Sequence, residues 1–134
     1  MDRRAFEHIV AHEWPQAVPE PFERIVRNVA VLVEDEPSPE IRAREGLTEG
    51  ETLLGYYQGI PHTARGVEYG VGATLPDTIT LYQKPIEEEA AHTDGDVARV
   101  VRETLWHEVA HHFGFDEDAV RTREEKRDRD GRHA

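Results

Sequence analysis

The stretch DVARVVRETLWHEVAHHFG, residues 96–114, gives the strongest structural signal in this chain of 134 residues. Apolar residues recur in it at the three- and four-residue spacing of a helix packed on one face. A second apolar stripe, formed by Trp106, Ala110 and Phe113, indicates that the end of the helix is covered on two sides. Asp96 can cap the start, and Gly114 can end the helix in a left-handed turn. The pattern predicts a long helix within the core.

Within this stretch, His107, Glu108 and His111 form an HExxH pattern. Two imidazoles four residues apart lie one helical turn from each other and can both bind one ion, with nitrogens at about 2.0–2.1 Å in a zinc site. The carboxylate beside the first histidine cannot easily reach that ion, but it can contact a water molecule bound to the ion and act as general base. We therefore predict His107 and His111 as zinc ligands and Glu108 as the base.

A catalytic zinc ion needs a third protein ligand and one open position. The chain has no cysteine, so the ligand must be His, Asp or Glu. A left-handed turn at Gly114 would bring the acidic residues 116–118 back towards the ion, and we expect one of their carboxylates to bind. A helix with two hydrogen-bonded histidines explains the pattern less well, because it buries Glu108 without a basic neighbour in the helix.

Other histidines and tyrosines are weaker candidates. His8 and His12 are also four residues apart, but no glutamate follows His8 and no glycine follows the pair, so we predict a partly exposed helix there. His112 is expected to pack rather than to bind metal. One tyrosine could stabilise an oxyanion, and the sequence does not choose among the four, Tyr56, Tyr57, Tyr69 and Tyr82.

Composition narrows the function classes. The net charge of −12 argues against nucleic acid and against an anionic membrane surface as partners. No segment reaches the roughly 18 apolar residues of a membrane span. The first residues carry charge without the apolar stretch of a secretory signal, so we expect a cytoplasmic protein. We predict one domain over residues 1–122 and a charged, disordered tail over residues 123–134.

The remaining elements are predicted from local pattern. Residues 3–14 show helical spacing, and Pro15 is expected to end that helix. Strands are predicted in the second half of residues 25–33, over residues 52–57 and over residues 78–82. Two prolines, two glycines and many charges favour a long loop over residues 34–50. Glycine density over residues 66–73 is typical of an edge strand or a close backbone approach.

Together with HEVAHHFG (residues 107–114), the blocks LGYYQGIP (54–61) and LPDTITLY (75–82) carry a family resemblance. The chain resembles small bacterial zincin-like metallopeptidases over most of residues 1–122. This implies an α+β fold, the minimal zincin-like fold, with a small, mostly parallel mixed sheet and one antiparallel edge strand, packed on an N-terminal helix and the active-site helix. The family pattern HExxHxxGxxD places its third ligand at Glu117, a glutamate in place of aspartate, with Asp116 in reserve. The family's edge strand holds an extended substrate, and by analogy residues 66–73 are the candidate.

The leading hypothesis is therefore a zinc-dependent metallopeptidase that acts on a peptide or protein. One alternative is a metal-dependent nuclease, because a bacterial endoribonuclease family uses a related helix; that family lacks a glutamate after its first histidine, and the charge of −12 is unfavourable for RNA. The other alternative is a metal-binding interaction module without turnover, since a chain of this length leaves little material for a substrate cleft.

Overall fold

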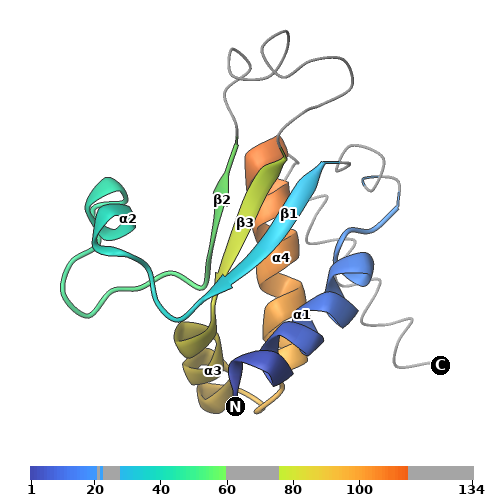
Figure 1. Ribbon diagram of the computed structural model, residues 1–134, viewed down its shortest axis with the longest axis horizontal. Helices are drawn as coiled ribbons and strands as arrows, with labels where there is room; N and C mark the ends of the chain where they lie inside the picture. Colours follow the sequence, from blue (N-terminus) through green and yellow to red (C-terminus); the bar gives the residue numbers. More distant parts are fainter. Residues whose placement is uncertain (21, 23–27, 60–75, 115–134) are drawn as a thin grey trace, which may run out of the picture.

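The structure is a computed structural model that describes residues 1–20, 22, 28–59 and 76–114. It contains both helices and strands, as Figure 1 shows. In order they are α1 (Arg3–Ala17), β1 (Val29–Glu34), α2 (Pro39–Arg44), β2 (Gly55–Gln58), β3 (Asp77–Tyr82), α3 (Gln83–His92) and α4 (Val97–Phe113). The described part of the chain contains no helix with the length and apolarity needed to cross a membrane.

The sheet described in the structure has the strand order β1-β3-β2. The central strand β3 runs parallel to β1, with Val29 opposite Asp77 and Glu34 opposite Tyr82. It runs antiparallel to β2, with Gly55 opposite Leu81. The expected α+β fold with a mixed sheet and an antiparallel edge strand is therefore confirmed, with β2 as that strand. Residues 66–73 lie outside the described residues.

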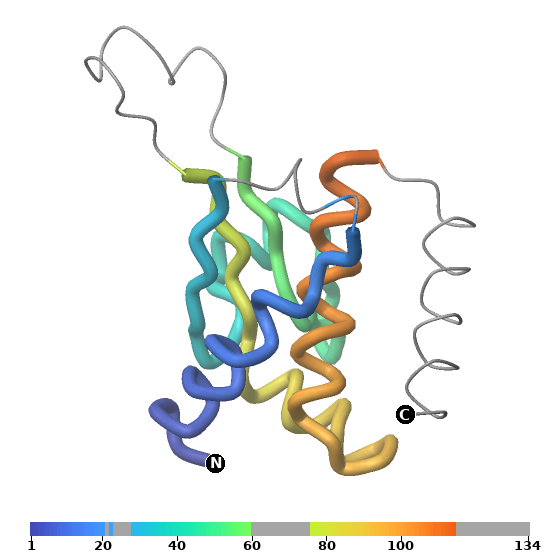
Figure 2. Tube along the Cα trace, turned by 90° about the vertical axis from the view of Figure 1, so that its right-hand side faces the viewer, coloured from blue at the N-terminus to red at the C-terminus, as the bar shows by residue number. Residues whose placement is uncertain are grey.

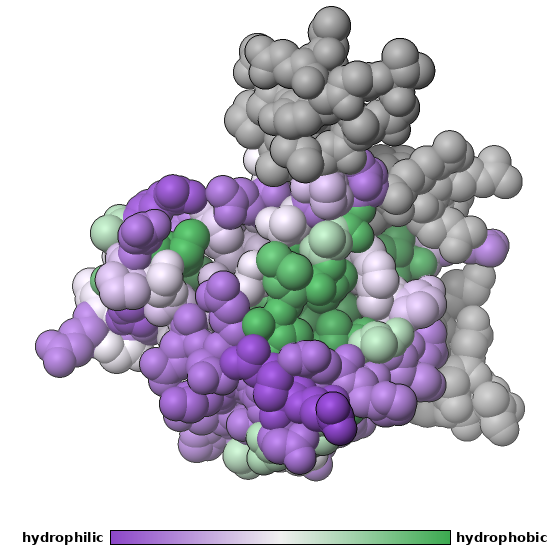
Figure 3. Space-filling view, viewed as in Figure 1, coloured by the Kyte–Doolittle hydropathy of each residue, from purple (hydrophilic) through white to green (hydrophobic). Residues whose placement is uncertain are grey.

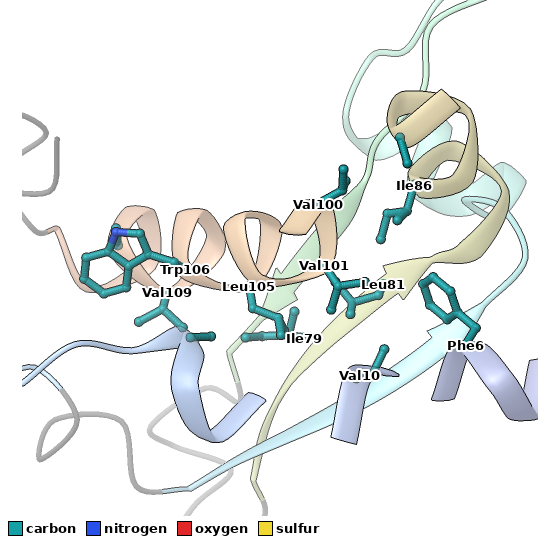
Figure 4. Close-up of a cluster of buried hydrophobic side chains, with 13 residues drawn as sticks. Phe6, Val10, Ile79, Leu81, Ile86, Val100, Val101, Leu105, Trp106 and Val109 are labelled. Atoms are coloured by element: carbon teal, nitrogen blue, oxygen red, sulfur yellow. The ribbon is translucent and has the colours of Figure 1, made fainter. Parts of the chain in front are cut away.

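A single hydrophobic core joins the sheet to α1 and α4. Figure 2 shows α4 to one side of the strands, with α1 crossing beside it. Ile79 and Leu81, alternate residues of β3, are fully buried, as the period of a half-buried strand requires. They meet side chains from both helices in the cluster drawn in Figure 4, which includes Phe6, Val10, Val101, Leu105, Trp106 and Val109. Each such side chain contributes about 1.5–3 kcal/mol of burial free energy, so α4 is anchored along its length.

The face in Figure 3 shows apolar residues gathered near its middle, with hydrophilic residues around them. Two large apolar side chains are exposed among the described residues, Met1 and Leu32, at 59% and 48%. Val29, Val31 and Leu32 of β1 line a groove against α1, together with Trp14. Strand β1 is therefore apolar on both sides, as its sequence VAVLVE indicates.

One helix boundary was predicted wrongly and one helix was missed, both near prolines. Helix α1 does not end at Pro15 but continues to Ala17. Pro15 falls in the last turn, where the missing N–H removes only one hydrogen bond near the helix end, and the continued turn buries Ala17 in the core. Pro85 similarly lies in the first turn of α3, where a backbone N–H has no partner within the helix. No helix was predicted over these residues.

The expected long loop over residues 34–50 contains α2, which is a further correction. The Ser38 hydroxyl accepts a hydrogen bond from the Ile41 N–H at 3.2 Å, and Pro39 begins the helix. Both are ordinary signals of a helix start. They were outweighed because α2 has no buried residue and therefore no apolar period. Strand β2 is also shorter than predicted and begins at Gly55.

Candidate metal centre

The ends of α4 are held by the residues that its sequence predicts. The Asp96 carboxylate accepts a hydrogen bond from the Arg99 N–H at 3.1 Å. Gly114 adopts the left-handed conformation, with φ 69° and ψ 30°, and its N–H bonds to the carbonyl of His111 at 3.3 Å. A side chain at this position would be strained. Helix α4 therefore ends at Phe113, two residues beyond His111, with Gly114 as its left-handed cap.

His107 and His111 both lie on the solvent-exposed side of α4. Their ring centroids are 5.6 Å apart and the rings are inclined at 55°. One ion at about 2.0–2.1 Å from a nitrogen of each ring can bridge this separation. Within the described residues no third histidine or acidic side chain completes a group of three, and the predicted ligands Glu117 and Asp116 lie outside those residues. The two imidazoles thus fit part of a zinc site.

Glu108, the residue after His107 on α4, is half-buried. Burial, and secondarily the nearby carboxylate of Glu45, raise the pKa of Glu108 from 4.5 to about 7. Among the described residues no basic side chain pairs with it. Glu45 follows α2, so the segment predicted as a plain loop supplies a charge that the sequence analysis missed. An unpaired, desolvated carboxylate is costly for folding. Its position beside two exposed imidazoles therefore favours a chemical role over a structural one.

Because the pKa of Glu108 is raised on folding, we expect the free energy of unfolding of the metal-free protein to depend on pH. Because the folded-state pKa of about 7 exceeds the unfolded value of 4.5, the protonated carboxyl favours the folded state, and that contribution is lost as pH rises from 4.5 to about 7. Glu108→Gln cannot titrate and should therefore gain stability over wild type across this window. Allowing for partial exposure, we expect a gain of roughly 2 kcal/mol. Urea unfolding in the presence of a chelator, at about pH 5 and pH 8, measures this difference in unfolding free energy. If the difference between Glu108→Gln and wild type were the same at both pH values, the raised pKa of Glu108 would be contradicted.

A cavity of about 340 Å³ adjoins His107 and Glu108. It lies between α4 and residues 52–55, which lead into β2. At Gly55 an added Cβ would lie 2.9 Å from Cγ2 of Thr104, so the backbone of β2 approaches α4 as closely as a glycine allows.

A polar cluster at the end of α4 was not predicted from sequence. The Tyr57 hydroxyl donates to Oδ2 of the buried Asp77 at 2.7 Å. The ring of His112 stacks on Tyr57 with centroids 3.8 Å apart, and its Nε2 lies 3.8 Å from the same Asp77 oxygen. The expectation that His112 packs is confirmed, although its side chain stays 37% exposed. The cluster ties β2 and β3 to the last turn of α4.

The tyrosines that were considered as oxyanion donors differ in their surroundings. The hydroxyl of Tyr57 is committed to Asp77. Tyr82 is buried, and burial together with the carboxylate of Glu34 raises its pKa to about 12. Tyr69 lies outside the described residues, and Tyr56 is half-buried. That one of the tyrosines stabilises an oxyanion therefore stays a prediction.

The second histidine pair lies on the exposed side of α1, as predicted. Nδ1 of His12 is 2.8 Å from Oε2 of the buried Glu13. Oε1 of Glu13 accepts a hydrogen bond from Arg102 of α4 at 2.7 Å. Burial raises the pKa of Glu13, but the hydrogen bonds from His12 and Arg102 outweigh it and lower the pKa. His12 thus helps to dock α1 on α4.

Comparison with known proteins adds one finding about the whole chain. The sequence profile of a family described as zincin-like metallopeptidase matches residues 26–127. The match contains all three strands described here, α4 and the acidic residues 116–118. No curated protein matches the sequence.

Proposed function

The chain belongs to the zincin-like metallopeptidase family, and from this membership we propose that it hydrolyses peptide bonds with a zinc ion held by His107, His111 and Glu117. Glu108 is the general base. One observation carries the proposal: two exposed imidazoles lie one turn apart on α4, with a half-buried carboxylate that has no basic partner beside them. A helix with a purely structural role has no need of that carboxylate.

In the proposed reaction the zinc ion and Glu108 have separate roles. When bound, zinc supplies Lewis acidity that lowers the pKa of a water molecule and polarises a carbonyl group. Glu108 accepts a proton from the attacking water as the oxygen bonds to the carbonyl carbon of the peptide. It then donates that proton to the leaving nitrogen as the carbon–nitrogen bond breaks. Its partial burial beside Glu45 favours a base that can both take and return a proton near neutral pH.

The substrate is proposed to lie as an extended chain along β2. The outer edge of this strand has no partner strand among the described residues. Backbone N–H and C=O groups at the edge of a sheet can pair with an added peptide strand. Leu54 and Gly55 share one cavity with His107 and Glu108, which supports a peptide path past the base.

Incubating the zinc-loaded chain with a broad peptide library and identifying products by mass spectrometry tests the proposal. We expect cleavage that stops on chelation and returns with zinc. An absence of products from protein that retains its zinc would overturn the proposed hydrolysis and favour a metal-binding module without turnover.

A further inference from the structure

The cavity beside Glu108 extends well beyond the reacting groups. Along α4 its lining runs from Glu108 back to Arg99. The two positions are nine residues apart, which is about 13.5 Å along a helix at 1.5 Å per residue. Helix α3, which lies at the N-terminal end of α4 in Figure 1, contributes Glu89. The cavity thus connects the proposed catalytic end of α4 to a separate set of charges.

Part of the cavity lining is apolar. Leu53, Leu54 and Val100 contribute apolar side chains to it, and Thr104 lies beside the close approach of Gly55. Cavities of this size are typical of small-ligand subsites, and apolar walls suit an aliphatic chain.

The far end of the cavity has an excess of negative charge. Arg99 is already paired, with its Nε 2.8 Å from Asp94 and its NH1 2.6 Å from Glu103. The hydrogen bond from Arg99 is the main reason that the pKa of Asp94 falls to about 2. The carboxylates of Asp94 and Glu103 therefore outnumber the one guanidinium. Glu89 adds another carboxylate, and no ion pair involves it among the described residues.

We infer that this cavity is a specificity subsite for a substrate residue with a long cationic side chain, lysine or arginine. This inference rests on the proposed peptidase function. The aliphatic stem would lie between the leucines and Val100, and the cation would reach Glu89 and Glu103. An uncharged aliphatic side chain fits the walls without the charge interaction, and an acidic side chain is repelled.

Binding and cleavage are measured separately to test the subsite. Zinc-loaded Glu108→Gln protein is titrated with fluorescent peptides that differ at one residue, which is lysine, norleucine or glutamate. Norleucine keeps the aliphatic stem of lysine without its charge. We expect the lysine peptide to bind about five times more tightly than the norleucine peptide, the gain of one favourable ion pair near the surface. The glutamate peptide should bind most weakly.

The variants Glu89→Lys and Glu88→Lys make a matched pair. Both glutamates are exposed on α3 and both changes alter the net charge equally, but only Glu89 lines this cavity. Glu89→Lys should remove the preference for lysine, and Glu88→Lys should keep it. Equal affinity for the lysine and norleucine peptides, no binding of either, or equal loss in both variants would overturn the subsite.

Wild-type cleavage of the same peptides separates the two proposals. Peptides that bind with the lysine preference but are not cleaved would overturn hydrolysis and leave the subsite standing. Peptides that are cleaved without any preference would overturn the subsite alone.

Discussion

Replacing Glu108 with glutamine is expected to lower kcat for peptide hydrolysis by at least about a hundredfold, the usual contribution of a positioned general base. Glutamine has the same shape but cannot accept the proton. Zinc content should not change, because the proposed ligands on this helix are His107 and His111. The assay is peptide cleavage by zinc-loaded protein, with zinc measured on the same samples.

Glu88→Gln is the matched control for this substitution. It makes the same carboxylate-to-amide change at an exposed position of α3, and it should cleave at the wild-type rate. If Glu108→Gln also cleaved at that rate, Glu108 would not be the base. If Glu108→Gln lost its zinc, the carboxylate would be a ligand instead.

Removal of the proposed third ligand is expected to have the second large effect, a loss of zinc affinity. Glu117→Ala should weaken zinc binding by more than about a hundredfold, because removal of an outer-shell partner alone costs 10–100-fold. Asp116→Ala should change the affinity only slightly, although it removes the same charge from the adjacent position. Competition with a chromogenic chelator measures both affinities. A large loss in Asp116→Ala with full affinity in Glu117→Ala would transfer the role to Asp116.

Much of α4 and its site could be predicted because the information is local. The apolar period, the cap at Asp96 and the glycine at position 114 all lie within one stretch of sequence, and they agree. The spacing of His107 and His111 follows from the helix itself. Strand β3 was equally accessible, because its alternating residues report one buried face.

The features that were missed depend on contacts between distant parts of the chain. Nothing in the local sequence of Glu45 indicates that it approaches Glu108. Tyr57 and Asp77 are 20 residues apart and meet only because β2 pairs with β3. The cavity likewise needs α3, which was not predicted as a helix since its proline falls in the first turn. Packing partners of this kind are set by the tertiary fold.

The zinc content of wild type and His111→Ala protein, measured by elemental analysis, tests whether α4 carries the metal. His8→Ala serves as control, because His8 belongs to the other histidine pair with i, i+4 spacing and is exposed on α1. We predict one zinc ion per chain in wild type and in His8→Ala, and little or none in His111→Ala. Equal zinc in wild type and His111→Ala would contradict the metal centre and, with it, the proposed hydrolysis.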